Sequence, residues 1–283
     1  MSRVWLITGC STGFGRALSR YVLAEGHQVS VTSRNVKDVE DIVIPYPDTA
    51  LALELDVTRK AQIEVTIEET LRRFGRIDVL VNNAGIGYFG AVEESEEAEA
   101  RRMFEINFFG LAAMIQQVLP VMRKQKSGHI LNISSIGGLR GFPGLGFYNA
   151  SKFAVEGLSE ALSKEVGPLG VRVTLVEPSG FRTDWAGRSA KDSPVRIEDY
   201  EGTAGQNSAT IRGYSGQQAG DPERAAKAIF QIVGYPEPPL RLLLGSAALR
   251  GARIKLEELK QDFDTWATLT CSADFPKNDP PQT

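Results

Sequence analysis

The chain has 283 residues, 42% of them apolar, which is enough to bury a full hydrophobic core in one large domain or two small ones. Its formal net charge of −3, with Lys and Arg scattered along the sequence, gives no reason to expect nucleic acid as a partner. The chain holds two histidines and two cysteines that match no metal-ligand spacing, so we expect no metal site and no histidine-based triad.

The amino-terminal residues and the apolar runs bear on where the protein works. Only Met1, Ser2 and Arg3 precede the first apolar run, which leaves no room for a signal peptide. The longest apolar runs, such as Phe108 to Ile115, are too short to span a bilayer. We therefore expect a soluble cytoplasmic protein without a membrane span.

The first predicted unit is a strand, a glycine-rich loop and a helix. The apolar run Val4 to Thr8 ends at a glycine, and Phe14 to Glu25 has helical period. Glycines let the backbone approach a phosphate, and a helix amino terminus offers free N–H groups and a positive dipole end. The Gly-x-x-x-Gly-x-Gly spacing differs from the commoner dinucleotide fingerprint and could also mark a tight turn. The candidate phosphate-binding residues are Gly9, Ser11, Thr12, Gly13, Phe14 and Gly15.

The second predicted strand, Gln28 to Thr32, ends where an acidic residue would bind the ribose 2′-hydroxyl of NAD. The chain has Ser33 and Arg34 there instead. An acid would repel a 2′-phosphate, whereas a guanidinium can pair with it through a planar fork of donors. This favours NADP(H), with a solvated arginine as the alternative.

Two further strands end in polar or small residues. Leu51 to Leu55 leads into Asp56, and a helix follows over Gln62 to Phe74. Val79 to Val81 then leads into Asn82-Asn83-Ala84-Gly85. A polar, small-residue exit from a buried strand suggests that a cofactor lies against it, so Asn82, Ala84 and Gly85 are candidate contacts.

A long core helix precedes the stretch that carries the candidate chemistry. Apolar positions recur with helical period from Phe104 to Met122, and Asn107 is a polar side chain near its start that needs a partner. A short strand from His129 then delivers Ser135, and the next helix carries Tyr148 and Lys152. These two lie four residues apart and stack on one helix face. An ammonium beside a phenol favours the phenolate, although such a pair alone is more often surface chemistry.

The last third of the chain contains one more unit and a segment of different composition. Val171 to Val176 predicts the sixth strand, and residues 184–220 are rich in Gly, Ser, Asp, Arg and Gln, which is typical of a lid over a substrate or of partial disorder. Asp221 and Pro222 start a helix. Leu240 to Leu244 is the last strand. A carboxyl-terminal extension at 246–273 contains the last helix, and the Pro-rich tail 274–283 is expected to be disordered.

Strands and helices alternate throughout, with no linker that would divide two domains. This pattern predicts a single Rossmann-like α/β domain, a doubly wound parallel sheet with helices on both faces. In such sheets ligands bind at the carboxyl ends of the strands. One residue or more from the candidate set follows each of six strands, so one sheet edge would collect them: Gly9, Arg34, Asp56, Asn82, Ser135 and Pro178.

At this point the chain resembles the short-chain dehydrogenases/reductases along almost its whole length. The motifs that carry the resemblance fall in the family order and spacing: Thr8-Gly9-x-x-x-Gly13-x-Gly15, Asp56, Asn82-Asn83-Ala84-Gly85, Asn107, Ser135, Tyr148-x-x-x-Lys152 and Pro178 through Thr183. The resemblance implies a seven-stranded sheet over residues 1–273 with a dinucleotide across it. It also implies dimers or tetramers built on the two long helices.

The resemblance further implies a role for each site residue. Tyr148 would give or take the proton on a carbonyl or alcohol oxygen while hydride moves to or from the nicotinamide. Lys152 would lower the Tyr148 pKa and bond the ribose, Ser135 would hold the substrate oxygen, and Asn107 would place a water. Other cofactor contacts would come from Asp56 and Val57 at the adenine and from Pro178, Gly180, Phe181 and Thr183 near the nicotinamide.

Two departures from the family pattern bear on the cofactor. Many NADP-preferring relatives have a basic residue where this chain has Thr12, so the NADP(H) expectation depends mainly on Arg34. The usual Pro-Gly after the sixth strand is Pro178-Ser179-Gly180. Within the family the chain looks most like carbonyl reductases and retinol- or hydroxysteroid-dehydrogenase-like members.

The predicted function is NADP(H)-dependent interconversion of a ketone or aldehyde and an alcohol. Aromatic residues flank the expected site, which favours an apolar or aromatic small molecule, although core packing explains some of them equally well. The alternative is a catalytically silent dinucleotide-binding regulator or scaffold of the same fold.

Overall fold

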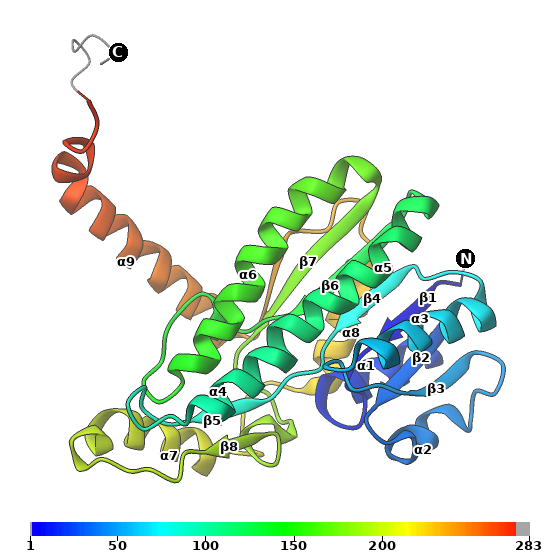
Figure 1. The fold of residues 1–283 in the computed structure, drawn as a ribbon, viewed down its shortest axis with the longest axis horizontal. Coiled ribbons are helices and arrows are strands. Elements are labelled where there is room, and N and C mark those ends of the chain that lie inside the picture. The colour runs from blue at the N-terminus through cyan, green and yellow to red at the C-terminus, as the bar shows by residue number, and fades with distance from the viewer. Residues whose placement is uncertain (1, 276–283) are drawn as a thin grey trace.

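The computed structural model describes residues 2–275 and is built around one seven-stranded parallel sheet in the order β3-β2-β1-β4-β6-β7-β9 (Figure 1). This confirms the predicted doubly wound sheet. The order reverses beside β1, because the chain first adds strands on one side of β1 and then crosses to the other. The strands are β1 (Val4–Ile7), β2 (Gln28–Ser33), β3 (Ala50–Glu54), β4 (Val79–Asn82), β6 (Gly128–Ile133), β7 (Val171–Pro178) and β9 (Arg241–Leu244).

Helices cover both faces of the sheet, because alternate side chains of each strand point to opposite sides. Trp5 and Ile7 of β1 face a core that α1 and α8 cover, whereas Leu6 faces the core beneath α3, α5 and α6. The helices are α1 (Gly13–Ala24), α2 (Glu40–Val43), α3 (Lys60–Phe74), α4 (Glu97–Phe104), α5 (Leu111–Gln125), α6 (Gly146–Val166), α7 (Gln206–Gly213), α8 (Pro222–Val233) and α9 (Ser246–Cys271).

The predicted core helix is part of a longer one. Helices α4 and α5 are joined without a break by a π-helical turn, Glu105–Gly110. The combined helix Glu97–Gln125, 29 residues, is long and apolar enough to cross a membrane by length and composition alone. Core helices of soluble proteins meet the same criterion, and here Met114, Ile115 and Val118 are buried in the core that α5 shares with the sheet.

The segment 184–220, which the sequence predicts to be a lid or partly disordered, contains regular structure. Strand β8 (Ala190–Asp192) pairs in parallel with β5 (Gly87–Phe89) as a separate two-stranded sheet. Helix α7 and short helical turns complete the segment, which lies at one end of the main sheet (Figure 1).

The carboxyl-terminal extension forms α9, which projects away from the sheet (Figure 1). Ala248 and Ala252 near its start are buried, and Gly251 lies against Ile136, whereas Phe263 and Trp266 are exposed. The predicted tail lies almost wholly outside the described residues.

Candidate active site

A large cavity runs along the carboxyl edge of the sheet. Its volume is about 1280 Å³, larger than the pockets of roughly 300–1,000 Å³ that hold one drug-sized ligand. It therefore has room for a dinucleotide and a small substrate together. The sequence-predicted residues that line it are Gly9, Ser11, Thr12, Gly13, Phe14, Ser33, Arg34, Asp56, Val57, Ala84, Gly85, Ser135, Tyr148, Lys152, Pro178, Gly180, Phe181 and Thr183.

The glycine loop forms a cradle at the amino terminus of α1. Gly9 and Gly13 have positive φ angles of 69° and 59°, which side chains rarely adopt. No side chain caps α1, so its first N–H groups are free to face an anion in the cavity. A Cβ on Gly15 would lie 2.5 Å from the Gly9 carbonyl oxygen. Gly15 therefore acts beneath the loop, by close packing, and does not line the cavity.

The exit of β4 places Asn83, and not the predicted Asn82, at the cofactor loop. Successive strand residues point in opposite directions, and the Asn82 amide is buried, donating to Asn132 Oδ1 at 2.9 Å. Asn83 lines the cavity, and its Nδ2 donates to the carbonyl oxygens of Thr8 and Gly9, both at 2.9 Å. The expectation of a direct Asn82 contact is thus corrected to a structural role.

Arg34 lies at the end of the cavity where an adenosine would sit. Its side chain is exposed, lines the cavity, and forms no ion pair within the described part of the chain. Burial raises the pKa of Asp56, but the hydrogen bonds from Thr58, with smaller contributions from the charges of Arg59 and Arg34, lower it overall. Asp38 lines the same part of the cavity. Arg34 is therefore available to an anion but shares its surroundings with two carboxylates.

Ser135, Tyr148 and Lys152 converge on the centre of the cavity. Ser135 follows β6, and its hydroxyl accepts from the Gly137 N–H at 2.9 Å. Tyr148 and Lys152 lie one turn apart on α6, and the Lys152 Nζ is 5.9 Å from the centroid of the Tyr148 ring. The same Nζ donates to the carbonyl of Ile133 at 2.8 Å, which holds the ammonium at the sheet edge.

Burial dominates the protonation of both helix residues. It raises the pKa of Tyr148 to about 12, and a hydrogen bond with Ser135 only partly opposes this. It lowers the pKa of Lys152 to about 8, while the charge of Glu156 acts in the opposite direction. Burial of the phenol opposes the lowering of the Tyr148 pKa by Lys152 that the resemblance implies, and that role of Lys152 stays a prediction. At neutral pH the phenol is protonated.

Asn107 is buried in the π-helical turn between α4 and α5 and does not line the cavity. Its Oδ1 accepts from the Ile86 N–H at 2.8 Å, and its Nδ2 donates to the Ile86 carbonyl at 3.0 Å and to Ser151 Oγ at 3.2 Å. Asn107 therefore fixes the wall of the cavity next to Gly85. Such π-helical turns are frequent at functional sites.

A buried acidic pair lies one turn beyond Lys152, and the sequence reasoning did not anticipate it. Glu156 of α6 and Glu177 of β7 are 5% and 0% exposed, and Arg241 Nε lies 3.2 Å and 3.4 Å from their carboxylates. Burial raises the pKa of both groups. One arginine between two desolvated carboxyls favours a single negative charge on the pair, with a proton held by the other carboxyl.

The substrate end of the cavity has an aromatic wall. Trp185 lies next to Tyr148, with ring centroids 4.9 Å apart, and its other neighbour is the fully buried Phe89 at 5.7 Å. Phe142, Leu145 and Ile211 belong to the same cluster and line the cavity. Aromatic flanking residues were expected here, but the sequence held no signal for Ile211, because α7 was not predicted as a helix.

The family model for short chain dehydrogenases matches residues 3–194. The chain is also similar to curated oxidoreductases over most of its length. The oxidoreductase BOA17 of Botryotinia fuckeliana is 36% identical over 274 residues, covering 96% of this chain and 100% of the relative. A 3-ketodihydrosphingosine reductase of Bacteroides thetaiotaomicron is 40% identical over 244 residues, covering 86% and 88%.

Solved structures show the same fold. A short-chain dehydrogenase from Streptomyces avermitilis has a TM-score of 0.91 and 40% identity, covering 97% of this chain and 100% of that chain. An alcohol dehydrogenase of Thermococcus sibiricus complexed with 5-hydroxy-NADP has a TM-score of 0.72 and 26% identity, covering 86% and 96%. A 3-ketoacyl-(acyl-carrier-protein) reductase of Brucella melitensis complexed with NADH has a TM-score of 0.71 and 26% identity, with the same coverage.

A doubly wound parallel sheet with a glycine-rich loop and a cavity at its carboxyl edge is the arrangement of a dinucleotide-binding fold. The chain belongs to the short-chain dehydrogenase/reductase family. Relatives in this family bind NAD or NADP.

Proposed function

We propose that this protein interconverts a ketone or aldehyde and an alcohol, using NADP(H) as the hydride carrier and Tyr148 as the acid or base. The observation that carries the proposal is the convergence of Ser135, Tyr148 and Lys152 in the cavity whose other end is the glycine cradle. When bound, the nicotinamide supplies or accepts a hydride, and the protein holds the oxygen and moves the proton.

The cradle fits a dinucleotide. A Cβ on Gly9 would lie 2.9 Å from Ala84 Cα, so the loop packs against β4 as closely as backbone allows and leaves the amino terminus of α1 facing the cavity. We assign the pyrophosphate to this loop, the adenosine to the surroundings of Asp56 and Val57, and the nicotinamide to Pro178, Gly180 and Thr183.

The three central residues then have separate roles. Ser135 holds the substrate oxygen, and Tyr148 exchanges the proton with it. Lys152, fixed by the Ile133 carbonyl, keeps a positive charge beside the phenol and reaches the ribose. The neutral phenol donates a proton in carbonyl reduction and its phenolate accepts one in alcohol oxidation, so Tyr148 can serve either direction.

Arg34 supports NADP(H) over NAD(H). Its exposed guanidinium lies at the end of β2, where a 2′-phosphate would accept a bidentate contact. The neighbouring Asp38 and Asp56 carboxylates weaken this preference, so we expect NADH to be used as well, with lower affinity.

The substrate is an apolar or aromatic carbonyl compound, because Trp185, Phe142, Leu145 and Ile211 line the space beside Tyr148.

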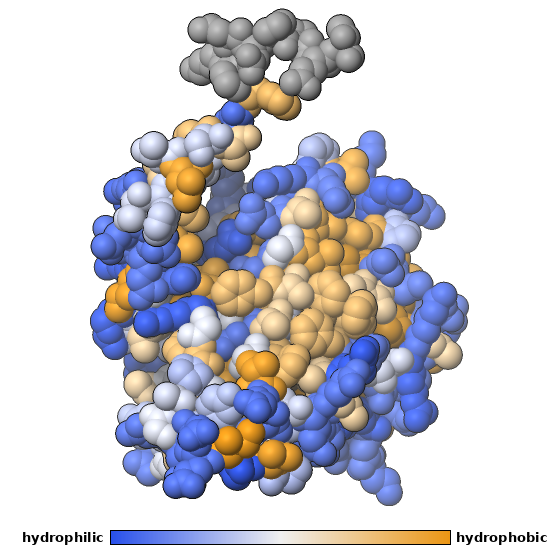
Figure 2. All heavy atoms as spheres, turned by 60° about the vertical axis from the view of Figure 1, so that its left-hand side comes forward, coloured by the Kyte–Doolittle hydropathy of each residue, from blue (hydrophilic) through white to orange (hydrophobic). Residues whose placement is uncertain are grey.

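The expectation of a homodimer or homotetramer in the cytoplasm stays a prediction. Phe109 of the π-helical turn and Phe153 of α6 are 52% and 46% exposed on two elements that pack together, and apolar side chains gather on the face beside α9 (Figure 2).

The experiment is a panel of aliphatic and aromatic ketones, aldehydes, steroids and retinoids with NADPH and NADH, followed by cofactor absorbance. The panel includes 3-ketodihydrosphingosine, on which the Bacteroides relative acts by its name. We expect NADPH oxidation with aromatic ketones, and a fall of at least roughly 100-fold in kcat for Tyr148→Phe, because general acid catalysis contributes about 10²–10⁴.

The matched control is Tyr214→Phe, since Tyr214 lines the same cavity but is 51% exposed. It should keep most activity, and both variants should bind NADPH like the wild type. Full activity of Tyr148→Phe, or NADPH binding without turnover of any compound, would reject the proposal, and the second result would favour a silent dinucleotide-binding protein.

A further inference from the structure

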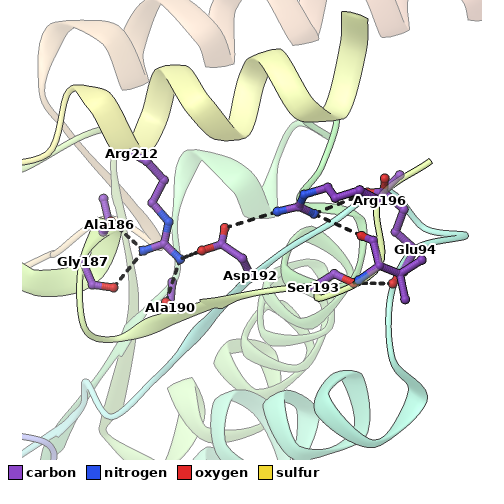
Figure 3. A network of polar contacts seen from close by, with 10 residues as sticks. Glu94, Ala186, Gly187, Ala190, Asp192, Ser193, Arg196 and Arg212 are labelled. Carbon is purple, nitrogen blue, oxygen red and sulfur yellow. Dashed lines mark hydrogen bonds and ion pairs between the residues drawn. The ribbon is translucent and has the colours of Figure 1, made fainter. Parts of the chain in front are cut away.

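Arg212 of α7 contacts the segment that carries Trp185 at several points (Figure 3). Its Nη1 donates to the carbonyl oxygens of Ala186 and Gly187, and its Nη2 donates to the carbonyl of Ala190, all at 2.8 Å. The Nη2 also contacts the Asp192 carboxylate at 2.8 Å. One guanidinium thus links four residues of the turn 186–192, in addition to the backbone hydrogen bonds of the turn itself.

The same guanidinium lies over an aromatic ring that leads to the active site. Arg212 Cζ is 4.5 Å from the centroid of Phe89, which is fully buried. Phe89 contacts Trp185, and Trp185 contacts Tyr148. Contacts therefore run without a gap from Arg212 to the proton-transferring phenol.

Trp185 is closely packed against β5 and β8. The indole lies over Gly87 of β5, where a Cβ would come within 3.0 Å of Trp185 Cζ2 and 2.8 Å of the Ala190 Cβ. The indole and the β5–β8 pair therefore pack against the same glycine, and Ala190 and Asp192 of β8 are both Arg212 partners.

We propose that Arg212 is a positioning residue that holds Trp185 against Tyr148 and thereby sets the shape of the substrate end of the cavity. The proposal rests on the proposed function in one respect, the role of Tyr148. Arg212 suits this task because a guanidinium stays charged, is planar, and directs donors to several acceptors at once. A lysine ammonium has three donors on a single nitrogen, and it lacks the two separate Nη atoms by which Arg212 bonds the carbonyls of Ala186 and Ala190.

The network offers a matched control at its outer end. Arg196 lies 3.8 Å from Glu94 and 4.0 Å from Asp192, and its side chain is 49% exposed (Figure 3). Exposed pairs of this kind contribute little, whereas hydrogen bonds from a charged group to buried acceptors contribute more. Removing either arginine deletes one positive charge beside Asp192, but only Arg212 reaches the turn that carries Trp185.

The experiment compares Arg212→Gln, Arg212→Lys and Arg196→Gln with the wild type. Hydrogen exchange of residues 184–192 should accelerate at least about 10-fold in both Arg212 variants, as expected when charged hydrogen bonds are lost, and stay unchanged in Arg196→Gln. The kcat/KM for the best aromatic ketone of the panel should fall about 10-fold or more relative to that for the best aliphatic ketone. NADPH affinity should change less than about 3-fold, since the cradle is untouched.

Three results would overturn the proposal: unchanged exchange in Arg212→Gln, equal effects of Arg196→Gln, or a parallel fall for both ketones and for NADPH binding, which would mean general destabilisation. Rescue by Arg212→Lys would show that charge suffices and would also contradict it. If the wild type reduces no carbonyl compound, the proposed function fails, and hydrogen exchange still decides the role of Arg212.

Discussion

The two ends of the cavity are built in different ways. The cofactor end consists of strand exits and the start of α1, all anchored in the two large hydrophobic cores on either side of the sheet. The substrate end depends on a small aromatic cluster and on the contacts of Arg212, an ion-pairing side chain 24% exposed. One end is thus fixed by close packing of the backbone and the other by side chains of a segment outside the main sheet.

The two ends of the cavity differ because dinucleotide binding and substrate selection place different demands on the protein. Binding a dinucleotide requires free N–H groups and close backbone approach, which glycines and a helix start supply in any sequence context. Selecting a substrate requires a surface of particular shape, which a segment outside the main sheet can change without disturbing the core.

The largest effect should follow from disturbing the glycine cradle. Gly9→Ala adds a Cβ at 2.9 Å from Ala84 Cα in a left-handed conformation, so the loop must shift. We expect NADPH to bind roughly 100-fold more weakly, since misplacement by about 1 Å can cost that factor. Isothermal titration with NADPH measures it.

The control for Gly9→Ala is Gly26→Ala. Gly26 has a similar φ of +79°, but nothing lies within 4 Å of its Cβ position. It carries the same backbone strain without touching the cavity and should leave NADPH affinity within about 2-fold of the wild type. Equal losses in the two variants would show that strain, and not the cradle, governs binding.

A smaller effect should follow at the adenosine end. Arg34→Asp replaces the free guanidinium with an acid, which repels a 2′-phosphate and can accept from the ribose hydroxyls. The ratio of kcat/KM for NADPH to that for NADH should fall about 10- to 100-fold, because a charged hydrogen bond is worth about 1.5–3 kcal/mol. Initial rates with both cofactors measure the ratio, and an unchanged ratio would mean that Arg34 is only solvated.

The smallest effect concerns the sheet that supports the cofactor end. His129 of β6 is buried, its Nε2 lies 2.9 Å from Thr174 Oγ1, and burial lowers its pKa to about 4. Between pH 6.5 and 5 the unfolded chain takes up a proton that the folded chain does not. Stability should therefore fall on acidification, by up to about 2 kcal/mol from this residue.

Urea unfolding at pH 7 and pH 5 tests this, with His129→Asn compared with the wild type. The variant should lose less stability on acidification than the wild type does. His27→Asn is the control, because His27 is only half-buried before β2 and burial lowers its pKa without a large shift. If the wild type and His129→Asn lost equal stability between pH 7 and pH 5, His129 would not be the source of the acid sensitivity.

The sequence predicts the cofactor end well because its signals are local. Glycine spacing, helical period and the residue that follows each strand are all visible within a few positions, and parallel strands bring them to one edge. The direction of a single side chain at a strand exit is less visible, which is why Asn82 was expected where Asn83 lies.

The substrate end could not be predicted in the same way. Arg212 acts through carbonyls about 22 to 26 residues away, in a segment without periodicity, and no spacing rule links it to Trp185. The buried pair of Glu156 and Glu177 also depends on two elements meeting in space. Likewise, the pKa of Tyr148 reflects its burial, which the Tyr-x-x-x-Lys pattern does not reveal.

The most direct test of the central claim is the transfer of a labelled hydride. With NADPH deuterated at the transferable position of nicotinamide C4 and the best ketone of the panel, the alcohol should carry one deuterium at its carbinol carbon. Tyr148→Phe should bind the same cofactor and form almost no labelled alcohol. An alcohol without deuterium, or an equal yield from Tyr148→Phe, would contradict hydride transfer with Tyr148 as the proton donor.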